Sequence, residues 1–347
     1  MHHKFNDIRP FCTSEIPEAM QVIAESEHFE LLARYIFPDR DVEEVREMIR
    51  TIRTTDEFQL NVMYYVNEQI VRRSITRLTQ NSFAHLDPRK PYLFVSNHRD
   101  IMLDSSLLQY ILHINGFRTT EITFGSNLMQ EALVTNIGRA NKMFKVIRSS
   151  NLHDFLKNSM LLSEYIRHTL TQKGESVWIA QRNGRTKDGH DATDQGMIKM
   201  FCMSDKSDLP RSVGELNIVP MAISYQIEPC DILKTRELYL SQGGEKYVKQ
   251  PDEDLNSILT GIMQPKGRVH LSLGNPITYE QLPSGQRHAN EFYKGVASLI
   301  DKQIYAHYKL YDNNYIAHDM RSGTSTYADR YTLEAKKIFE ERCNAML

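Results

Sequence analysis

The sequence of 347 residues lacks the cysteine pattern of a metal-binding or disulfide-stapled protein. Its cysteines are few, lie far apart and show no CxxC or mixed Cys/His spacing, which argues against a zinc site and a disulfide framework. We therefore expect reduced, mostly buried thiols in a cytoplasmic protein. The cysteines are Cys12, Cys202, Cys230 and Cys343.

Long apolar runs and an excess of one charge are also missing. No stretch reaches the roughly 18 consecutive apolar residues of a membrane-spanning helix, and the N-terminal MHHKFNDIRPF has no apolar signal-peptide core. The 42 Lys and Arg against 44 Asp and Glu give a net charge of -2, which provides no general attraction for nucleic acid. We therefore expect no nucleic-acid partner, and any anion site must be local.

The sequence shows no Gly-rich phosphate loop, nucleotide fingerprint, metal-ligand cluster or internal repeat. The acidic stretch KDGHDATD fails the spacing of a calcium loop, so we interpret it as a polar loop. We predict no bound cofactor and no metal. With 41% hydrophobic and 25% charged residues, the composition is that of a globular protein with a sizeable core.

The first part of the chain is helical in pattern. Apolar residues recur at helical spacing, as in the pairs Met20 with Ile23 and Val45 with Ile49. From about residue 90, short apolar runs alternate with helical stretches, which predicts an α/β fold with a mixed twisted sheet flanked by helices. The predicted strands are Tyr92–Val95, Glu121–Gly125, Phe144–Ile147, Ser176–Gln181, Asn217–Ser224 and Val269–Gly274, with helices at Ser105–Ile114 and Leu152–Leu170.

We divide the chain into an N-terminal helical region (1–85), an α/β domain (86–320) and a C-terminal loop and helix (321–347). Polar, Gly- or Ser-containing loops are expected at Gln242–Pro251 and Arg321–Tyr327, and a last helix at about Tyr331–Met346.

The stretch LFVSNHRDIMLD, residues 93 to 104, places a histidine where an apolar strand ends and an apolar helix begins. Loops at such junctions often expose reactive groups, because the rigid sheet positions a side chain that the loop leaves accessible. Taken alone, His98 is more simply interpreted as a structural histidine that ties the turn.

Of three later stretches, two add cationic residues at predicted strand ends. NKMFKVIRSS has Arg148 at the end of its predicted strand, and VWIAQRNGRTKDG places Arg182, Arg185 and Lys187 around Gly184. NIVPMAISY is an apolar strand interrupted by Pro220.

In this order, the four stretches resemble the four sequence blocks of the glycerolipid acyltransferase superfamily, which contains glycerol-3-phosphate and 1-acylglycerol-3-phosphate acyltransferases. The resemblance spans about residues 90 to 225. It implies an acyltransferase of phospholipid biosynthesis in which His98 is the general base and Asp104 orients it. The sequence departs from the family in two places: one extra residue separates His98 from Asp104, and Arg182 and Asn183 stand where a glutamate is expected.

The chemistry supports these residues independently of the family. Acyl transfer from a thioester to an alcohol requires removal of the hydroxyl proton, which suits an imidazole that a carboxylate holds on its other nitrogen. Six residues of helix would turn Asp104 about 240° away from His98, so the residues after His98 must be non-helical for the two to meet. Asp100 is the alternative carboxylate.

Guanidinium groups are suited to a phosphorylated acceptor, because their planar fork pairs two phosphate oxygens. Arg148 and Arg185 are our first choices and Arg182 and Lys187 the second, although each alone could be a surface charge. The supporting residues are Asn97, Arg99, Asp100, Gly184 and Pro220.

The resemblance further implies acyl-CoA or acyl carrier protein as donor and a glycerophosphate or lysophospholipid as acceptor. Because that lipid lies in a membrane, we expect a cytoplasmic protein peripheral to the membrane surface. Two alternatives stay open: an N-acyltransferase that makes an amino-acid lipid, and a catalytically silent lipid-binding relative.

Overall fold

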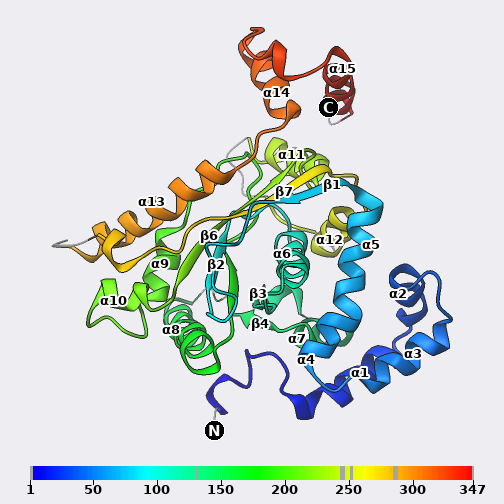
Figure 1. Ribbon diagram of the computed structural model, residues 1–347, viewed down its shortest axis with the longest axis vertical. Coiled ribbons are helices and arrows are strands. Elements are labelled where there is room, and N and C mark those ends of the chain that lie inside the picture. Colours follow the sequence, from blue (N-terminus) through cyan, green and yellow to red (C-terminus); the bar gives the residue numbers. More distant parts are fainter. Residues whose placement is uncertain are drawn as a thin grey trace.

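The computed structural model describes residues 3–129, 131–147, 149, 151–242, 247–250, 253–283 and 288–345. Over these residues a seven-stranded mixed sheet has the strand order β1-β7-β6-β2-β5-β3-β4, and helices flank it (Figure 1). The predicted α/β class is confirmed, and each of the six predicted strands is present within a few residues of its expected bounds. The strands are β1 (Ile75–Gln80), β2 (Leu93–Ser96), β3 (Glu121–Gly125), β4 (Met143–Val146), β5 (Val177–Ala180), β6 (Ile218–Tyr225) and β7 (Gly267–Leu273).

Strand β1 lies in the region that the sequence pattern predicted to be helical. It follows directly after the preceding helix and pairs in parallel with β7, almost 200 residues later in the chain. The β-branched residues Ile75, Thr76 and Thr79 favour extended backbone. The partner strand that stabilises this edge is remote in sequence, so the local pattern did not reveal it.

The sheet directions place several strand ends together. β2 is parallel to both β5 and β6, and β3 is parallel to both β4 and β5, whereas β6 and β7 are antiparallel. All four residues of β2 and all eight of β6 are buried, as expected for central strands covered on both faces. The carboxyl ends of β2 to β6 therefore lie at one edge, where open α/β sheets bind ligands.

The sheet separates at this edge between β3 and β5. These strands pair only at Glu121 with Val177 and at Ile122 with Trp178. By contrast, β2 follows β5 as far as Ser96 and Ala180, and β3 follows β4 as far as its last residue. The last residues of β3 and β5 therefore belong to two diverging halves of the sheet.

Two apolar cores cover the two faces of the sheet. One contains buried residues of α8 (Leu152–His168), α9 (Gln195–Phe201) and α13 (Ala289–His307), and the other contains buried residues of α5 (Tyr64–Ser74) and α6 (Leu103–Ile114). A third core joins α1, α2 and α3 to Ala140 at the end of α7, so the first helices pack beside the sheet domain (Figure 1). The helices of the first half are α1 (Ile16–Glu25), α2 (Phe29–Ile36), α3 (Val42–Thr51), α4 (Thr55–Phe58), α5 (Tyr64–Ser74), α6 (Leu103–Ile114), α7 (Ala132–Ala140) and α8 (Leu152–His168).

The C-terminal helices α14 and α15 lie above the sheet in Figure 1. α15 is held to α11 by Arg342, whose guanidinium donates to both carboxylate oxygens of Asp231 at 2.6 and 2.7 Å. The division at residues 85 and 320 stays a proposal. The remaining helices are α9 (Gln195–Phe201), α10 (Leu209–Gly214), α11 (Asp231–Leu240), α12 (Glu253–Met263), α13 (Ala289–His307), α14 (Asp312–Ser322) and α15 (Leu333–Asn344).

Some expectations need correction or fall outside the described part of the chain. The four thiols are free, but only Cys202 and Cys230 are buried, and Cys12 is exposed. Part of the predicted loop Gln242–Pro251 (residues 243–246 and 251) lies outside the described residues. The first two residues of the predicted loop Arg321–Tyr327 belong to α14. Of the helices described, none has the length and apolar character needed to span a membrane.

Candidate active site

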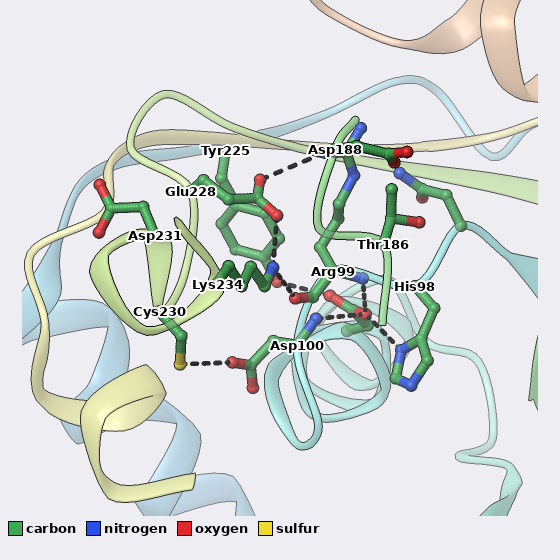
Figure 2. Close-up of polar contacts among 12 residues, drawn as sticks. His98, Arg99, Asp100, Thr186, Asp188, Tyr225, Glu228, Cys230, Asp231 and Lys234 are labelled. Atoms are coloured by element: carbon green, nitrogen blue, oxygen red, sulfur yellow. Dashed lines mark hydrogen bonds and ion pairs between the residues drawn. The ribbon is translucent and has the colours of Figure 1, made fainter. Parts of the chain in front are cut away.

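His98 lies in the connection between β2 and α6. Residues 97 to 100 are neither helix nor strand, and α6 begins only at Leu103. This non-helical path absorbs the extra residue before Asp104, and Nδ1 of His98 lies 3.1 Å from Oδ2 of Asp104 (Figure 2). The imidazole is 15% exposed, whereas the carboxylate is fully buried.

The Asp104 carboxylate is fixed by several donors. The backbone N–H groups of Arg99 and Asp100 donate to Oδ2 at 2.7 and 2.9 Å. The Tyr225 hydroxyl, at the end of β6, donates to Oδ1 at 3.0 Å. Because these donors hold both oxygens, Asp104 can hold the imidazole in one orientation.

Asp100 has a different environment. Its Oδ1 accepts the backbone N–H groups of Met102 and Leu103, both at 2.9 Å, so it caps the start of α6. Burial, together with the charge of Asp104, raises the pKa of the Asp100 carboxyl. Of the two carboxylates that the sequence left open, the geometry joins Asp104 to His98.

A cleft of about 430 Å³ opens beside His98, at the carboxyl ends of β3, β4 and β5. Its lining combines residues from both faces of the sheet, which meet where β3 and β5 diverge. Trp178 and Phe124 belong to the core on the α6 side, and Leu162 and Met200 belong to the core on the α8 side. Apolar side chains and His98 therefore line one cleft, so an apolar chain bound there would lie beside the imidazole.

Basic side chains from two elements line the same cleft. Arg182 and Arg185, both partly buried, come from the loop after β5, and Lys145 comes from β4. Buried Nη1 of Arg185 has no hydrogen-bond partner among the described residues. Gly184 between the arginines has φ +78°, a left-handed conformation that glycine adopts without strain. The side chains of Asp194 and Asp254 also line the cleft, so its polar part carries both signs of charge.

Two other predicted cations do not line the cleft. Lys187 forms an ion pair with Glu237 of α11. Arg99 is buried and donates to Asp191 at 2.6 Å. Its Nη1 lies 3.4 Å from Glu228 (Figure 2). Arg99 is therefore a buried structural cation. Arg148 lies outside the described residues.

The predicted supporting residues join strands. Oδ1 of Asn97 accepts the N–H of Ile223 at 2.8 Å, and Nδ2 donates to the carbonyl of Ile223 at 3.0 Å, which ties the end of β2 to β6. Pro220 is buried in β6 beside Val95 of β2. Both residues position the strand that ends before His98.

Asp191 was missed because its sequence, KDGHDATD, reads as an exposed polar loop. It is buried and accepts hydrogen bonds from Arg99 at 2.6 Å, from Thr186 at 2.7 Å and from Asn97 at 3.3 Å. The Thr186 N–H also donates to the His98 carbonyl at 2.7 Å. The loop with the two arginines is thus fastened to the histidine segment.

Other missed residues left weak signals in the sequence. Lys145 is a cation inside the otherwise apolar run MFKV, and no ion pair to it is found among the described residues. Trp178 is the single tryptophan. Its ring and the His98 ring lie edge to face, with their centroids 6.2 Å apart. Within the described part of the chain, no three His, Cys, Asp or Glu side chains are grouped as metal ligands would be.

Comparison with known proteins gives no family assignment. No family model and no curated protein matches the chain. Among solved structures, it is similar to the 1-acyl-sn-glycerophosphate (LPA) acyltransferase PlsC from Thermotoga maritima, with TM-score 0.36 and 12% identity over 86% of this chain and 98% of that one. It is also similar to the signal recognition particle receptor FtsY from Elizabethkingia anophelis, with TM-score 0.24 and 9% identity over 82% and 85% of the two chains. Scores this low carry no functional argument.

Proposed function

We propose that the protein is an acyltransferase that moves a fatty acyl group from acyl-CoA or acyl carrier protein to a hydroxyl of glycerol-3-phosphate or lysophosphatidate. The observation that carries the proposal is the His98–Asp104 pair, held at 3.1 Å beside a cleft with cationic and apolar lining. A fatty acyl thioester and a phosphorylated alcohol need these two kinds of lining.

His98 acts as the general base in this proposal. With Nδ1–H donating to Asp104, Nε2 is free to take the proton of the acceptor hydroxyl as its oxygen attacks the thioester carbonyl. The tetrahedral intermediate then expels the thiolate as the C–S bond breaks. The imidazolium gives its proton to the thiolate, so the free thiol leaves and His98 is neutral again. Asp104 stabilises the imidazolium between these two steps.

Arg182, Arg185 and Lys145 are proposed to bind the acceptor phosphate. Their position beside His98 would hold the phosphate while the hydroxyl reaches Nε2. Arg148 is proposed as a further ligand on sequence grounds. The apolar residues Leu162 and Met200 are proposed to contact the fatty chain. We further propose that the protein works at the membrane surface, where a lysophospholipid resides.

An acceptor screen tests the proposal. Purified protein is given palmitoyl-CoA or a carrier-linked palmitoyl donor with glycerol-3-phosphate, lysophosphatidate or an aminoacyl lipid. Esterification of a phosphorylated acceptor supports the proposal. Reaction of the amine alone would instead favour an N-acyltransferase, and no turnover with any pair would favour a silent lipid-binding protein.

Substitution of the cleft cations should weaken acceptor binding. Arg185→Gln or Lys145→Gln removes a charge-assisted contact worth about 1.5 to 3 kcal/mol, so KM for the phosphorylated acceptor should rise roughly 10- to 100-fold while kcat changes little. Steady-state kinetics at varied acceptor concentration measures this. Lys187→Gln is the matched control, because Lys187 is paired outside the cleft. An equal rise in KM for the control would contradict the assignment.

Filling the apolar side of the cleft should shorten the preferred acyl chain. Met200→Trp adds volume where Met200 lines the cleft, and excluding two methylenes costs about 1.6 kcal/mol, or roughly 15-fold in kcat/KM for a palmitoyl donor. An octanoyl donor should react at nearly the unchanged rate. An equal loss of kcat/KM with both donors would show that Met200 does not contact the acyl chain.

A further inference from the structure

We infer that Tyr225 is a positioning residue for the base, the third member of a hydrogen-bonded chain Tyr225–Asp104–His98. The inference rests on the proposed function. It adds a residue that acts through Asp104 and does not line the cleft.

The two oxygens of Asp104 have different partners. Oδ2 receives the imidazole and two backbone N–H groups, whereas Oδ1 is bound, among the described residues, by the Tyr225 hydroxyl alone. Small rotations of the carboxylate about its Cβ–Cγ bond would change the direction in which Oδ2 meets the imidazole, while the two backbone N–H groups keep Oδ2 within hydrogen-bonding distance. Tyr225 therefore provides the side-chain contact that opposes this rotation.

Tyr225 is itself held firmly. It is the last residue of β6, pairs with Val269 of β7 and is 3% exposed. Burial and the neighbouring carboxylates of Asp104 and Asp100 raise the pKa of its phenol well above 10. The hydroxyl consequently stays protonated and remains a donor throughout the pH range in which a histidine base titrates.

The hydrogen bond from Tyr225 should also weaken the electrostatic stabilisation that the Asp104 carboxylate gives to protonated His98. A carboxylate that accepts another donor stabilises the imidazolium less than one that does not. The titratable groups that face this chain are Asp100 and Glu228 toward Tyr225, Arg185 toward Asp100, and Tyr308 toward Asp104. The Tyr225→Phe change leaves all of them in place.

Tyr225→Phe tests the inference, with Tyr165→Phe as its matched control. Tyr165 also donates to a buried carboxylate, Glu121 at 2.6 Å, but at the amino end of β3, away from the cleft. Tyr225→Phe should lower kcat roughly 10-fold with KM for the acceptor within about twofold. The limb of the pH–rate profile on which activity rises with pH should move upward, because a carboxylate that has lost the Tyr225 donor stabilises the imidazolium more strongly.

Tyr165→Phe should lower the thermal midpoint and leave kcat and the pH–rate limb unchanged. If Tyr225→Phe behaves like this control, Tyr225 is merely structural and the inference is wrong. If Tyr225→Phe does not fold, site-specific 3-fluorotyrosine at this position keeps the ring and strengthens the donor. That replacement should move the limb downward, and an unmoved limb would overturn the inference.

A readout without turnover separates this inference from the proposed function. NMR titration of ¹⁵N-histidine protein, with the His98 signal assigned by its loss in His98→Ala, reports protonation of the ring directly. An upward shift in Tyr225→Phe supports the hydrogen-bonded chain even if every acceptor fails. An unchanged titration in an active enzyme overturns the chain and leaves the acyltransferase proposal intact.

Discussion

His98→Ala is expected to lower the rate of acyl transfer about 10²- to 10⁴-fold, the usual cost of losing a general base. The fold should survive, because the Asp104 carboxylate keeps two backbone donors and the Tyr225 hydroxyl when the imidazole is removed. Binding of donor and acceptor should change little, since the cations and the apolar lining remain. Single-turnover kinetics for the chemical step and calorimetry for binding measure the two effects separately.

The pH dependence provides a second check on this expectation. The wild-type rate should rise with pH as His98 loses its proton, and this rise should be absent from the residual activity of His98→Ala. A residual rate within threefold of wild type would mean that another group removes the hydroxyl proton. His113→Ala is a suitable control, because His113 lies on α6 but does not line the cleft.

Asp104→Asn is expected to approach the loss seen for His98→Ala. The amide can keep an oxygen toward the imidazole and the two backbone N–H groups, but it cannot supply the negative charge that stabilises the imidazolium. The loss should therefore appear in kcat, with binding of the phosphorylated acceptor nearly intact.

Asp100→Asn is the matched control for Asp104→Asn. Asp100 uses one oxygen to accept the backbone N–H groups of Met102 and Leu103, and an amide oxygen can accept the same bonds. Its effect on kcat should be small. If Asp100→Asn were the damaging change and Asp104→Asn the harmless one, the base would be paired with Asp100, and the assignment of Asp104 would be wrong.

The sequence was most informative where a property is local. The six predicted strands are short apolar runs bounded by turn residues, and their burial makes the pattern strong. The distance between His98 and Asp104 was also predictable in part. A regular helix would have separated them, so their meeting required the non-helical residues that the structure has after β2.

The sequence was least informative where a residue depends on a distant partner. Arg99 and Lys187 look like free cations in sequence, but Asp191 and Glu237 neutralise them from other parts of the chain. Strand β1 forms because its backbone pairs with the edge of β7. The opening between β3 and β5 likewise depends on how two strands diverge, which neither strand encodes by itself.

The hydrogen bonds that join the loop of Arg182 and Arg185 to the segment of His98 have a regiochemical consequence. Thr186 binds the His98 carbonyl, and Asp191 binds both Thr186 and Arg99, so the loop that carries Arg185 and the base cannot shift independently. Under the proposed function, the number of bonds between phosphate and hydroxyl in the acceptor must match this fixed separation. Glycerol-3-phosphate carries two hydroxyls at different distances from its phosphate. The protein would therefore acylate the hydroxyl whose distance from the phosphate matches the separation of Arg185 and His98. The hydrogen bonds of one loop would thus determine the regiochemistry of the reaction.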